Sequence, residues 1–247
     1  MLPPYAFYLD LDYHGTFPRV GKSDHLFTQE LELGLPYRFQ LAVELNQELQ
    51  NGRSQVPFTT IEARWAPANW GKIPLNPAFF VEYDIGTGKQ YATQPGQNAA
   101  PESGEESKQN IPDEYEVRLL LGQEIGKNIE FASNIFFDQA LWADREGEIG
   151  FSTATSFAIR GEALKVGLET SYQNISGSGA GTKAQNILEL GPSFTIKPRP
   201  HTRIDVAPLC GITRDSPDVE LFVIFSIDFG TGAAAEVEAP AARGGRH

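Results

Sequence analysis

The sequence lacks features that define several common protein classes. Its one cysteine, Cys210, excludes a disulfide within the chain, and its one methionine, Met1, excludes a methionine-rich binding surface. No run of about 18 apolar residues is present, which excludes a helical membrane span. Basic residues are scarce, with 20 Lys and Arg against 32 Asp and Glu and a formal charge of -12. We therefore expect no nucleic-acid partner, because phosphate binding needs a basic surface.

The start of the chain lacks a recognisable export signal. Residues 1–7, MLPPYAF, form neither a basic leader nor an apolar signal segment. If the protein is exported, we expect these residues to be either a mature start or a start that is preceded by further sequence.

The sequence does have a regular alternation of apolar and polar residues. In the segment 220–229, Leu221, Val223, Phe225 and Ile227 share one face of a strand, whereas Glu220, Ser226 and Asp228 lie on the other. Because side chains alternate across a strand with period two, this pattern predicts a strand with one apolar and one wet face.

The same alternation recurs along the whole chain. It predicts about twelve strands of roughly 9 to 11 residues, the length that a tilted strand needs to cross a bilayer. The expected strands are 5–13, 27–35, 39–48, 60–65, 79–85, 114–124, 129–138, 148–160, 164–173, 188–197, 203–213 and 220–229.

The connections between these strands alternate between tight and long. Tight ones are 36–38, 126–128, 161–162 and 198–201; longer polar ones are 14–24, 49–56, 86–112 and 174–186. Short turns at one end and long loops at the other are typical of outer-membrane barrels. Residues 67–76 are long for the turn end, and 143–147 are short for the loop end. The predicted fold is all-β: a single antiparallel up-and-down transmembrane β-barrel over residues 1–229.

Two segments are predicted to carry no regular structure. Residues 87–109, within the long polar loop 87–112, are rich in Gly, Pro, Gln, Ser and Glu, and this composition cannot bury enough surface to offset the entropy of ordering. Residues 230–247 are mostly Ala, Gly, Pro and Glu, and we expect a disordered C-terminal tail after the last strand.

Alternation alone also fits a soluble lipocalin-like barrel or β-sandwich, since any antiparallel sheet with one wet face shows it. The membrane barrel is favoured by loop asymmetry, strand length and aromatic residues near strand ends, where membrane interfaces place amphipathic rings. These aromatic residues are Tyr5, Tyr13, Tyr37, Trp65, Trp70, Tyr83, Tyr115, Trp142 and Tyr172.

Two segments of the chain resemble a known group of membrane proteins. The segment ELELGLPYRFQL at 30–41 and the aromatic-ended last strand are similar to bacterial outer-membrane barrels, in particular the poorly characterised transporter barrels related to the MetA proteins of phenol-degradation operons. The likeness covers residues 5–229. It implies an outer-membrane location, a transport or pore role and an assembly signal at Phe229, although a tail follows that residue.

The polar faces supply the candidate lumen. The predicted lumen-lining residues are Glu30, Glu32, Glu44, Glu62, Arg64, Glu82, Asp84, Glu116, Arg118, Asp138, Arg160, Lys165, Glu169, Arg203 and Asp205. A barrel of about twelve strands leaves room for a narrow pore. Because carboxylates outnumber basic groups, such a pore would favour small cationic or neutral solutes, with outer-membrane lipid as the surrounding partner. A plugged structural or surface-binding barrel is the alternative, because buried charges demand partners and these residues can pair with one another.

Signals for enzymatic chemistry are weak. A hydrolase needs a nucleophile within hydrogen-bond reach of a base, and Ser23 beside His25 is the only local candidate. His and Cys residues show no metal-site spacing, and the sequence predicts no catalytic residue, no metal and no cofactor.

Overall fold

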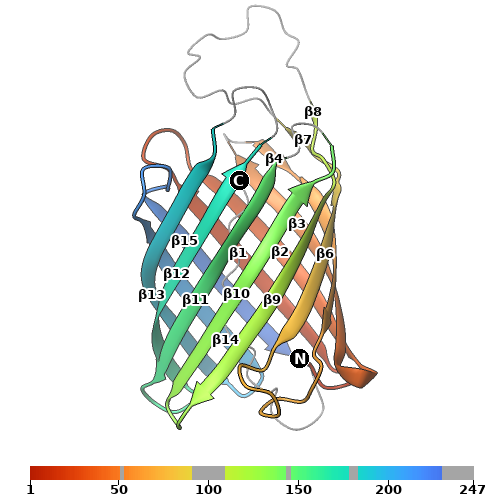
Figure 1. Cartoon of the computed structure of the whole chain (residues 1–247), viewed down its shortest axis with the longest axis vertical. Helices are drawn as coiled ribbons and strands as arrows, with labels where there is room; N and C mark the ends of the chain where they lie inside the picture. Colours follow the sequence, from red (N-terminus) through yellow and green to blue (C-terminus); the bar gives the residue numbers. More distant parts are fainter. Residues whose placement is uncertain (51–52, 91–108, 143–145, 178–182, 230–247) are drawn as a thin grey trace, which may run out of the picture.

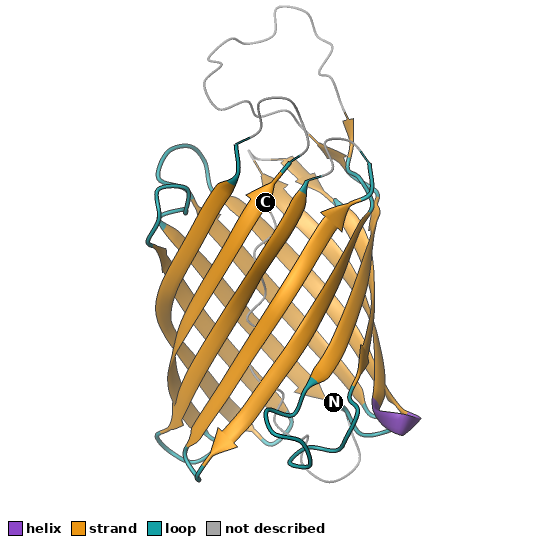
Figure 2. Cartoon of the chain, viewed as in Figure 1, coloured by secondary structure: helices purple, strands orange, loops and turns teal. Residues whose placement is uncertain are grey.

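The computed structural model describes residues 1–50, 53–90, 109–142, 146–177 and 183–229. Twelve strands form a closed antiparallel barrel (Figures 1 and 2). They are β1 (Phe7–Phe17), β2 (Asp24–Leu35), β3 (Phe39–Gln50), β5 (Phe58–Trp65), β6 (Ala78–Gly86), β9 (Glu114–Ile125), β10 (Ile129–Ala140), β11 (Gly147–Ala158), β12 (Leu164–Ser176), β13 (Gln185–Arg199), β14 (Thr202–Gly211) and β15 (Val219–Asp228). The predicted fold class is confirmed.

Neighbours in the sequence are neighbours in the sheet, and the first and last strands close it. β1 pairs with β15 from Tyr8 opposite Asp228 to Phe17 opposite Val219, and the ring continues because β2 pairs with both β1 and β3. Closure leaves no unpaired edge in the barrel. Among the described residues, no helix is long and apolar enough to cross a membrane.

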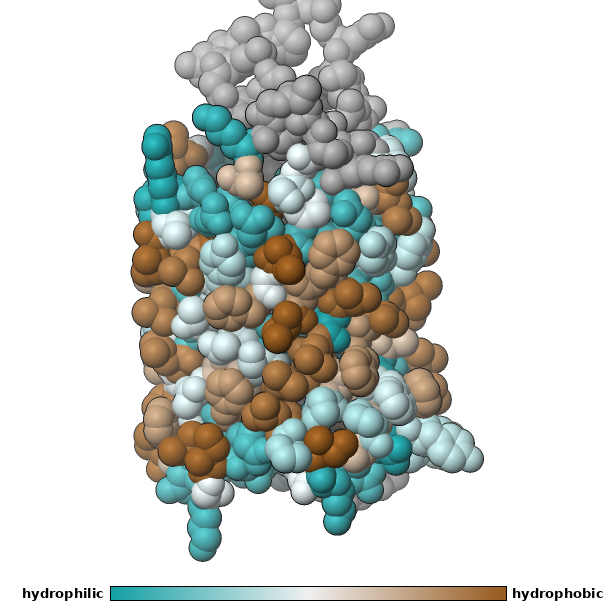
Figure 3. Space-filling model, in the orientation of Figure 1, coloured by the Kyte–Doolittle hydropathy of each residue, from teal (hydrophilic) through white to brown (hydrophobic). Residues whose placement is uncertain are grey.

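The barrel is apolar outside and polar inside. Leu41 and Val117 are 44% and 42% exposed on the outer surface, whereas Glu44 is 6% exposed and faces the interior. Figure 3 shows apolar residues covering much of the visible wall between more polar ends. A soluble barrel has the opposite arrangement, so the lipocalin-like alternative is disfavoured by which face of each strand is buried.

The connections also follow the predicted asymmetry. At one end, here the turn end, η1 (Pro36–Arg38) joins β2 to β3, and residues 126–128 and 200–201 make equally short turns. The opposite end, here the loop end, carries most of the longer connections; the exception is the long β5–β6 connection, residues 66–77, at the turn end. Two short ladders extend the loop end, one between β3 and β4 (Arg53–Gln55) and one between β7 (Lys89–Gln90) and β8 (Gln109–Asn110).

The pair β7 and β8 adds local order at both edges of the predicted unstructured segment 87–109. Residues 91–108 of that segment, and the predicted tail 230–247, lie outside the described residues.

One seam of the barrel departs from a regular ladder. The β13–β14 register pairs Leu190 with Cys210 and Phe194 with Val206, which sets Pro192 opposite Pro208. Ile212 donates its N–H to the Leu188 carbonyl at 2.8 Å. Because backbone groups alternate between the two neighbouring strands, the other even-numbered residues of β13, including Pro192, also direct their backbone groups toward β14. Because proline has no N–H, this seam lacks two ladder donors near the middle of the strands.

Candidate functional site

The interior surface is built by every second residue of each strand. On β2, Glu30 and Glu32 are 0% and 1% exposed, while Leu31 between them is 53% exposed on the outside. The same alternation runs along β3, β5 and β6. Closing the sheet therefore collects polar side chains from distant parts of the sequence inside one cylinder.

Part of this interior is an open cavity of about 520 Å³. Its walls come mainly from β1, β2, β3, β5, β6, β9 and β15, with Arg203 and Asp205 from β14 and Asn134 from β10. The charged residues along it are the acids Asp10, Asp12, Glu30, Glu32, Glu44, Glu62, Glu82 and Asp205 and the bases Arg38, Arg64, Arg118 and Arg203. Carboxylates are thus in twofold excess over guanidinium groups.

Arg64 organises the largest charge network in the cavity. Its guanidinium lies 3.0 Å from Glu30, 2.8 Å from Glu32 and 2.8 Å from Glu62. Gln40 adds a donor, because its side-chain amide donates to Glu32 at 2.7 Å. One cation therefore serves three carboxylates from two strands, which is how a closed interior tolerates so many acids.

A second network surrounds Phe80 on β6. The guanidinium carbons of Arg118 and Arg64 lie 4.9 Å and 5.3 Å from the Phe80 ring centre, a distance typical of cation–π contact. Arg118 also forms an ion pair with Glu116 and lies 4.0 Å from Glu82. The aromatic ring holds two cations at the cavity surface while the neighbouring carboxylates balance them.

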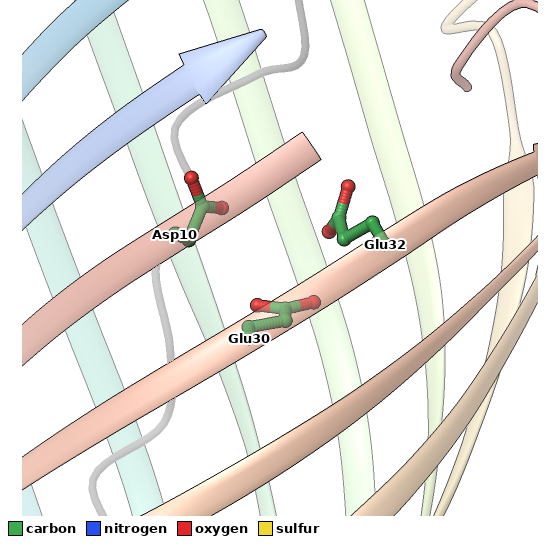
Figure 4. A group of neighbouring side chains, drawn as sticks. All are labelled: Asp10, Glu30 and Glu32. Carbon is green, nitrogen blue, oxygen red and sulfur yellow. The ribbon is translucent and has the colours of Figure 1, made fainter. Parts of the chain in front are cut away.

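Carboxylates converge at two places near Arg64. The carboxylate oxygens of Asp10, Glu30 and Glu32 lie within 4.8 Å of one another, as do those of Glu30, Glu44 and Glu62. Figure 4 shows the first group, with Asp10 on β1 and both glutamates on the neighbouring strand β2. Oxygen donors of this type suit hard cations such as Ca²⁺ or Mg²⁺. Arg64 already supplies positive charge to Glu30, Glu32 and Glu62.

The turn end of the cavity is narrowed by two segments that the alternation pattern did not reveal. The first is the N-terminal segment, residues 1–6. Leu2 is buried, and its N–H donates to Gln40 Oε1 at 3.0 Å. Tyr5 holds the same segment against β2, because its N–H donates to the Gly34 carbonyl at 2.7 Å. A side chain at Gly34 would collide with the Pro3 carbonyl, so glycine permits this close approach.

The β5–β6 connection is the second narrowing segment. Arg38 donates to the backbone carbonyls of Ala66 and Pro67 at 2.9 and 3.1 Å. Trp70 of this connection lines the cavity, so it does not take the place in the lipid interface belt that its position in the sequence suggested. The connection folds over the barrel mouth, and this brings Trp70 to the cavity. Tyr37, in the short turn η1 at the same end, is 83% exposed and points away from the cavity.

The predicted lumen residues fall into three groups. Those that line the cavity are Glu30, Glu32, Glu44, Glu62, Arg64, Glu82, Arg118, Arg203 and Asp205. Those on the inner face but away from the cavity are Asp84, Glu116, Asp138, Lys165 and Glu169. Arg160 is exposed because β11 ends at Ala158 and the chain has turned toward Leu164, so the prediction that it faces the lumen is wrong.

The residue predicted to be the assembly signal lies at the end of the last strand. Phe229 follows β15, is 58% exposed, and donates its N–H to the Phe7 carbonyl at 3.0 Å. The backbone ladder between the first and last strands therefore extends through this residue. Its role in assembly stays a prediction.

Some interior residues were missing from the predicted lumen set. Asp10 and Asp12 line the cavity, and their shared polar face on the first strand was a sufficient signal for including them. His14 lies 3.3 Å from Glu220 and stacks on Phe222, a contact that depends on closure of β15 against β1. No pattern within either strand predicts that pairing.

The weak hydrolase hypothesis gains no support from the local geometry. The His25 ring nitrogen Nδ1 lies 2.9 Å from Tyr13 Oη, and the two rings are stacked at 5.9 Å. This pairing gives the candidate base a phenol partner on the neighbouring strand. It does not bring a nucleophile to the ring.

Comparisons with known proteins support the fold without assigning a family. No family model matches the chain, and no curated protein matches it. The solved structures that it resembles include the COG4313 outer membrane channel from Pseudomonas putida F1, with a TM-score of 0.60, 9% identity, and coverage of 93% of this chain and 97% of that one.

Two further structures have comparable similarity. The NanC porin has a TM-score of 0.53 and 10% identity, covering 90% of this chain and all of the porin. The translocator domain of the autotransporter NalP from Neisseria meningitidis has a TM-score of 0.54 and 9% identity, covering 92% and 89%. At such low identity the likeness shows the barrel fold alone, and membership of the MetA-related group stays a prediction.

Proposed function

We propose that this chain forms a narrow pore in a bacterial outer membrane and admits small cationic or neutral solutes. The observation that carries the proposal is the 520 Å³ cavity with a twofold excess of carboxylates, enclosed by a barrel whose outer wall is apolar. A negative lining attracts cations and repels anions, while uncharged solutes are little affected.

The membrane location is supported by the outer surface. Val43, Ile61, Phe79 and Leu168 are each at least half exposed, which is unfavourable in water but favourable against lipid. Aromatic residues lie near both ends of the strands, for example Trp65 at the turn end and Tyr83 at the loop end. Such rings are suited to the polar–apolar boundary of a bilayer.

The fold neighbours give independent support for a pore. Two of them carry the words channel or porin in their descriptions, and both are covered almost completely by the match. A shared barrel does not specify a solute, so the cation preference rests on the lining of this chain.

Single-channel recording in planar bilayers tests the proposal. With a salt gradient of KCl across the bilayer, we expect discrete current steps and a reversal potential that reports K⁺ as more permeant than Cl⁻. The double substitution Glu44→Gln and Glu82→Gln removes two cavity carboxylates and is expected to shift the reversal potential toward zero. Glu124→Gln, at an exposed residue near the turn end of β9, is the matched control and should leave it unchanged. Anion preference, or no current from correctly folded protein, would overturn the proposal.

A further inference from the structure

The cavity changes character along the barrel axis. On β2, Leu26 lies nearer the loop end than Glu30, and on β5 Phe58 lies nearer the loop end than Glu62. The closing strand repeats this order, since β15 places Phe222 nearer the loop end than Ser226. An apolar zone at the loop side therefore precedes the carboxylates on β2 and β5, and Phe222 of β15 adds to this zone.

A second apolar zone lies on the turn side of the carboxylates. On β9, Leu120 is nearer the turn end than Arg118, and Leu2 and Trp70 reach the cavity from the two segments that narrow this end. Apart from Arg38 at the turn end, the charged cavity residues on β2, β5 and β9 thus lie between two zones that offer hydrocarbon and aromatic surface.

The closing strands bring charge and apolar surface into direct contact. Asp12 on β1 lies opposite Ile224 on β15, and His14 lies opposite Phe222. Asp12, Ile224 and Phe222 all line the cavity. A ligand held here meets a carboxylate and an apolar wall within one or two residues of each other.

This arrangement has different consequences for different cations. A hydrated inorganic cation gains from the carboxylates but nothing from the apolar zones, where stripping its water is costly. An organic cation with an apolar body gains from both, because its ammonium group lies among the carboxylates while its hydrocarbon part leaves water. The cavity volume of about 520 Å³ is in the range that accommodates a small organic molecule.

We propose that the preferred solutes are amphipathic organic cations, with an ammonium or amidinium group at the band formed by Asp10, Asp12 and Glu44 and an apolar body against Phe222 and Ile224. This inference rests on the proposed pore function, and it adds the chemical class of the solute. It makes the apolar lining as important for selection as the charge.

Competition with the K⁺ current tests the solute class. We use phenethylammonium, ethylammonium and phenylacetate as chloride or potassium salts, each titrated against the full chain in a planar bilayer. Phenethylammonium is expected to halve the K⁺ current at a concentration about tenfold lower than ethylammonium, because only phenethylammonium has a phenyl group to bury against the apolar wall. Phenylacetate has the same ring and the opposite charge, and should not reduce the current in this range.

Paired substitutions show whether block of the K⁺ current depends on the apolar wall, on the carboxylates, or on both. Phe222→Ala is expected to remove most of the preference for phenethylammonium over ethylammonium while K⁺ selectivity persists. Phe136→Ala, which truncates a buried interior phenylalanine on β10 away from the cavity, is its control.

Asp12→Asn should weaken block by both ammonium ions, whereas Glu148→Gln on β11 should not. Ile224→Thr replaces Phe222→Ala if the latter does not fold.

The outcomes separate this inference from the proposed function. Absence of current in every salt means that the pore function fails. A normal cation-selective K⁺ current that phenethylammonium and ethylammonium block equally overturns the solute class and leaves the pore intact. Equal block by phenylacetate also overturns it, since ring burial alone would then explain binding.

Discussion

Two walls of the barrel face the same interior with very different side chains. The wall formed by β1, β2, β3, β5 and β6, here the cavity wall, carries long charged residues gathered around Arg64. The wall formed by β10 to β13, here the far wall, has charged inward residues such as Asp138, Lys165 and Glu169 separated by many small ones: Ala132, Gly150, Ser152, Ala154, Ser156, Gly167, Ser171, Gly191 and Ser193.

The outer faces of the two walls are alike. Val43 on the cavity wall and Leu168 on the far wall are both 54% exposed. The comparison teaches that lipid imposes one requirement around the whole circumference, whereas the interior is free to differ from strand to strand. Within the described strands, the differences between the two walls therefore lie on the inner faces.

The largest expected effect comes from removing the central cation of the cavity wall. Arg64→Met leaves three buried carboxylates without their shared partner, and we expect a loss of about 3–5 kcal/mol in the free energy of unfolding. Denaturant unfolding in detergent, followed by circular dichroism, measures this loss. The far-wall counterpart Lys165→Met should cost less, because its partners Glu130 and Glu162 are 19% and 60% exposed and water can reach both carboxylates. Equal losses would contradict the distinction between the walls.

A smaller effect is expected from charging the outer faces. Val43→Arg and Leu168→Arg each place a guanidinium against lipid near the middle of a strand, at a cost of about 2–4 kcal/mol. Because lipid is the same on both sides, the two costs should agree within about 1 kcal/mol. Refolding into lipid vesicles, monitored by tryptophan fluorescence, compares them. A large difference would indicate that one wall is covered by protein instead of lipid.

The smallest effect concerns the turn between β11 and β12. Partial burial raises the pKa of Glu162, but hydrogen bonds from Lys165 and Lys197 outweigh it, so the pKa is lowered overall. Because the folded pKa is lower than the unfolded one, the stabilisation is present above the unfolded pKa. It is lost as pH falls through the folded pKa.

Glu162→Gln should therefore reduce stability slightly at neutral pH and have no effect in strong acid. Unfolding midpoints of both proteins across acid and neutral pH measure this difference. Glu124→Gln serves as the control at an exposed turn-end position. A penalty that grows on acidification would contradict the assignment.

Much of the fold is predictable from the sequence because lipid outside and water inside impose the same alternation on every strand. The segments expected at 129–138 and 164–173, for example, correspond to β10 and β12. Strand ends are less predictable, since alternation continues into turns. Arg160 continues the polar alternation beyond Ala158, where the strand has already ended, and this explains its wrong assignment to the lumen.

The cavity is less predictable than the fold, because it depends on contacts between strands. Arg64 and Glu62 are two residues apart, and their pairing was visible in the sequence. The contact of Arg64 with Glu30 joins residues 34 positions apart and follows from the register of β2, β3 and β5. Trp70 reaches the cavity only because a connection folds over the mouth, which alternation cannot indicate.

The facing prolines Pro192 and Pro208 give the cylinder a preferred line of opening. The other neighbouring strands of the barrel ring are joined by longer continuous registers, whereas β13 and β14 pair over two short stretches on either side of these prolines, and a register shift separates the second from the pair Arg199–Thr202. If the wall parts under heat or mechanical load, we expect it to part here first. The product would be a curved open sheet with β13 at one edge and β14 at the other.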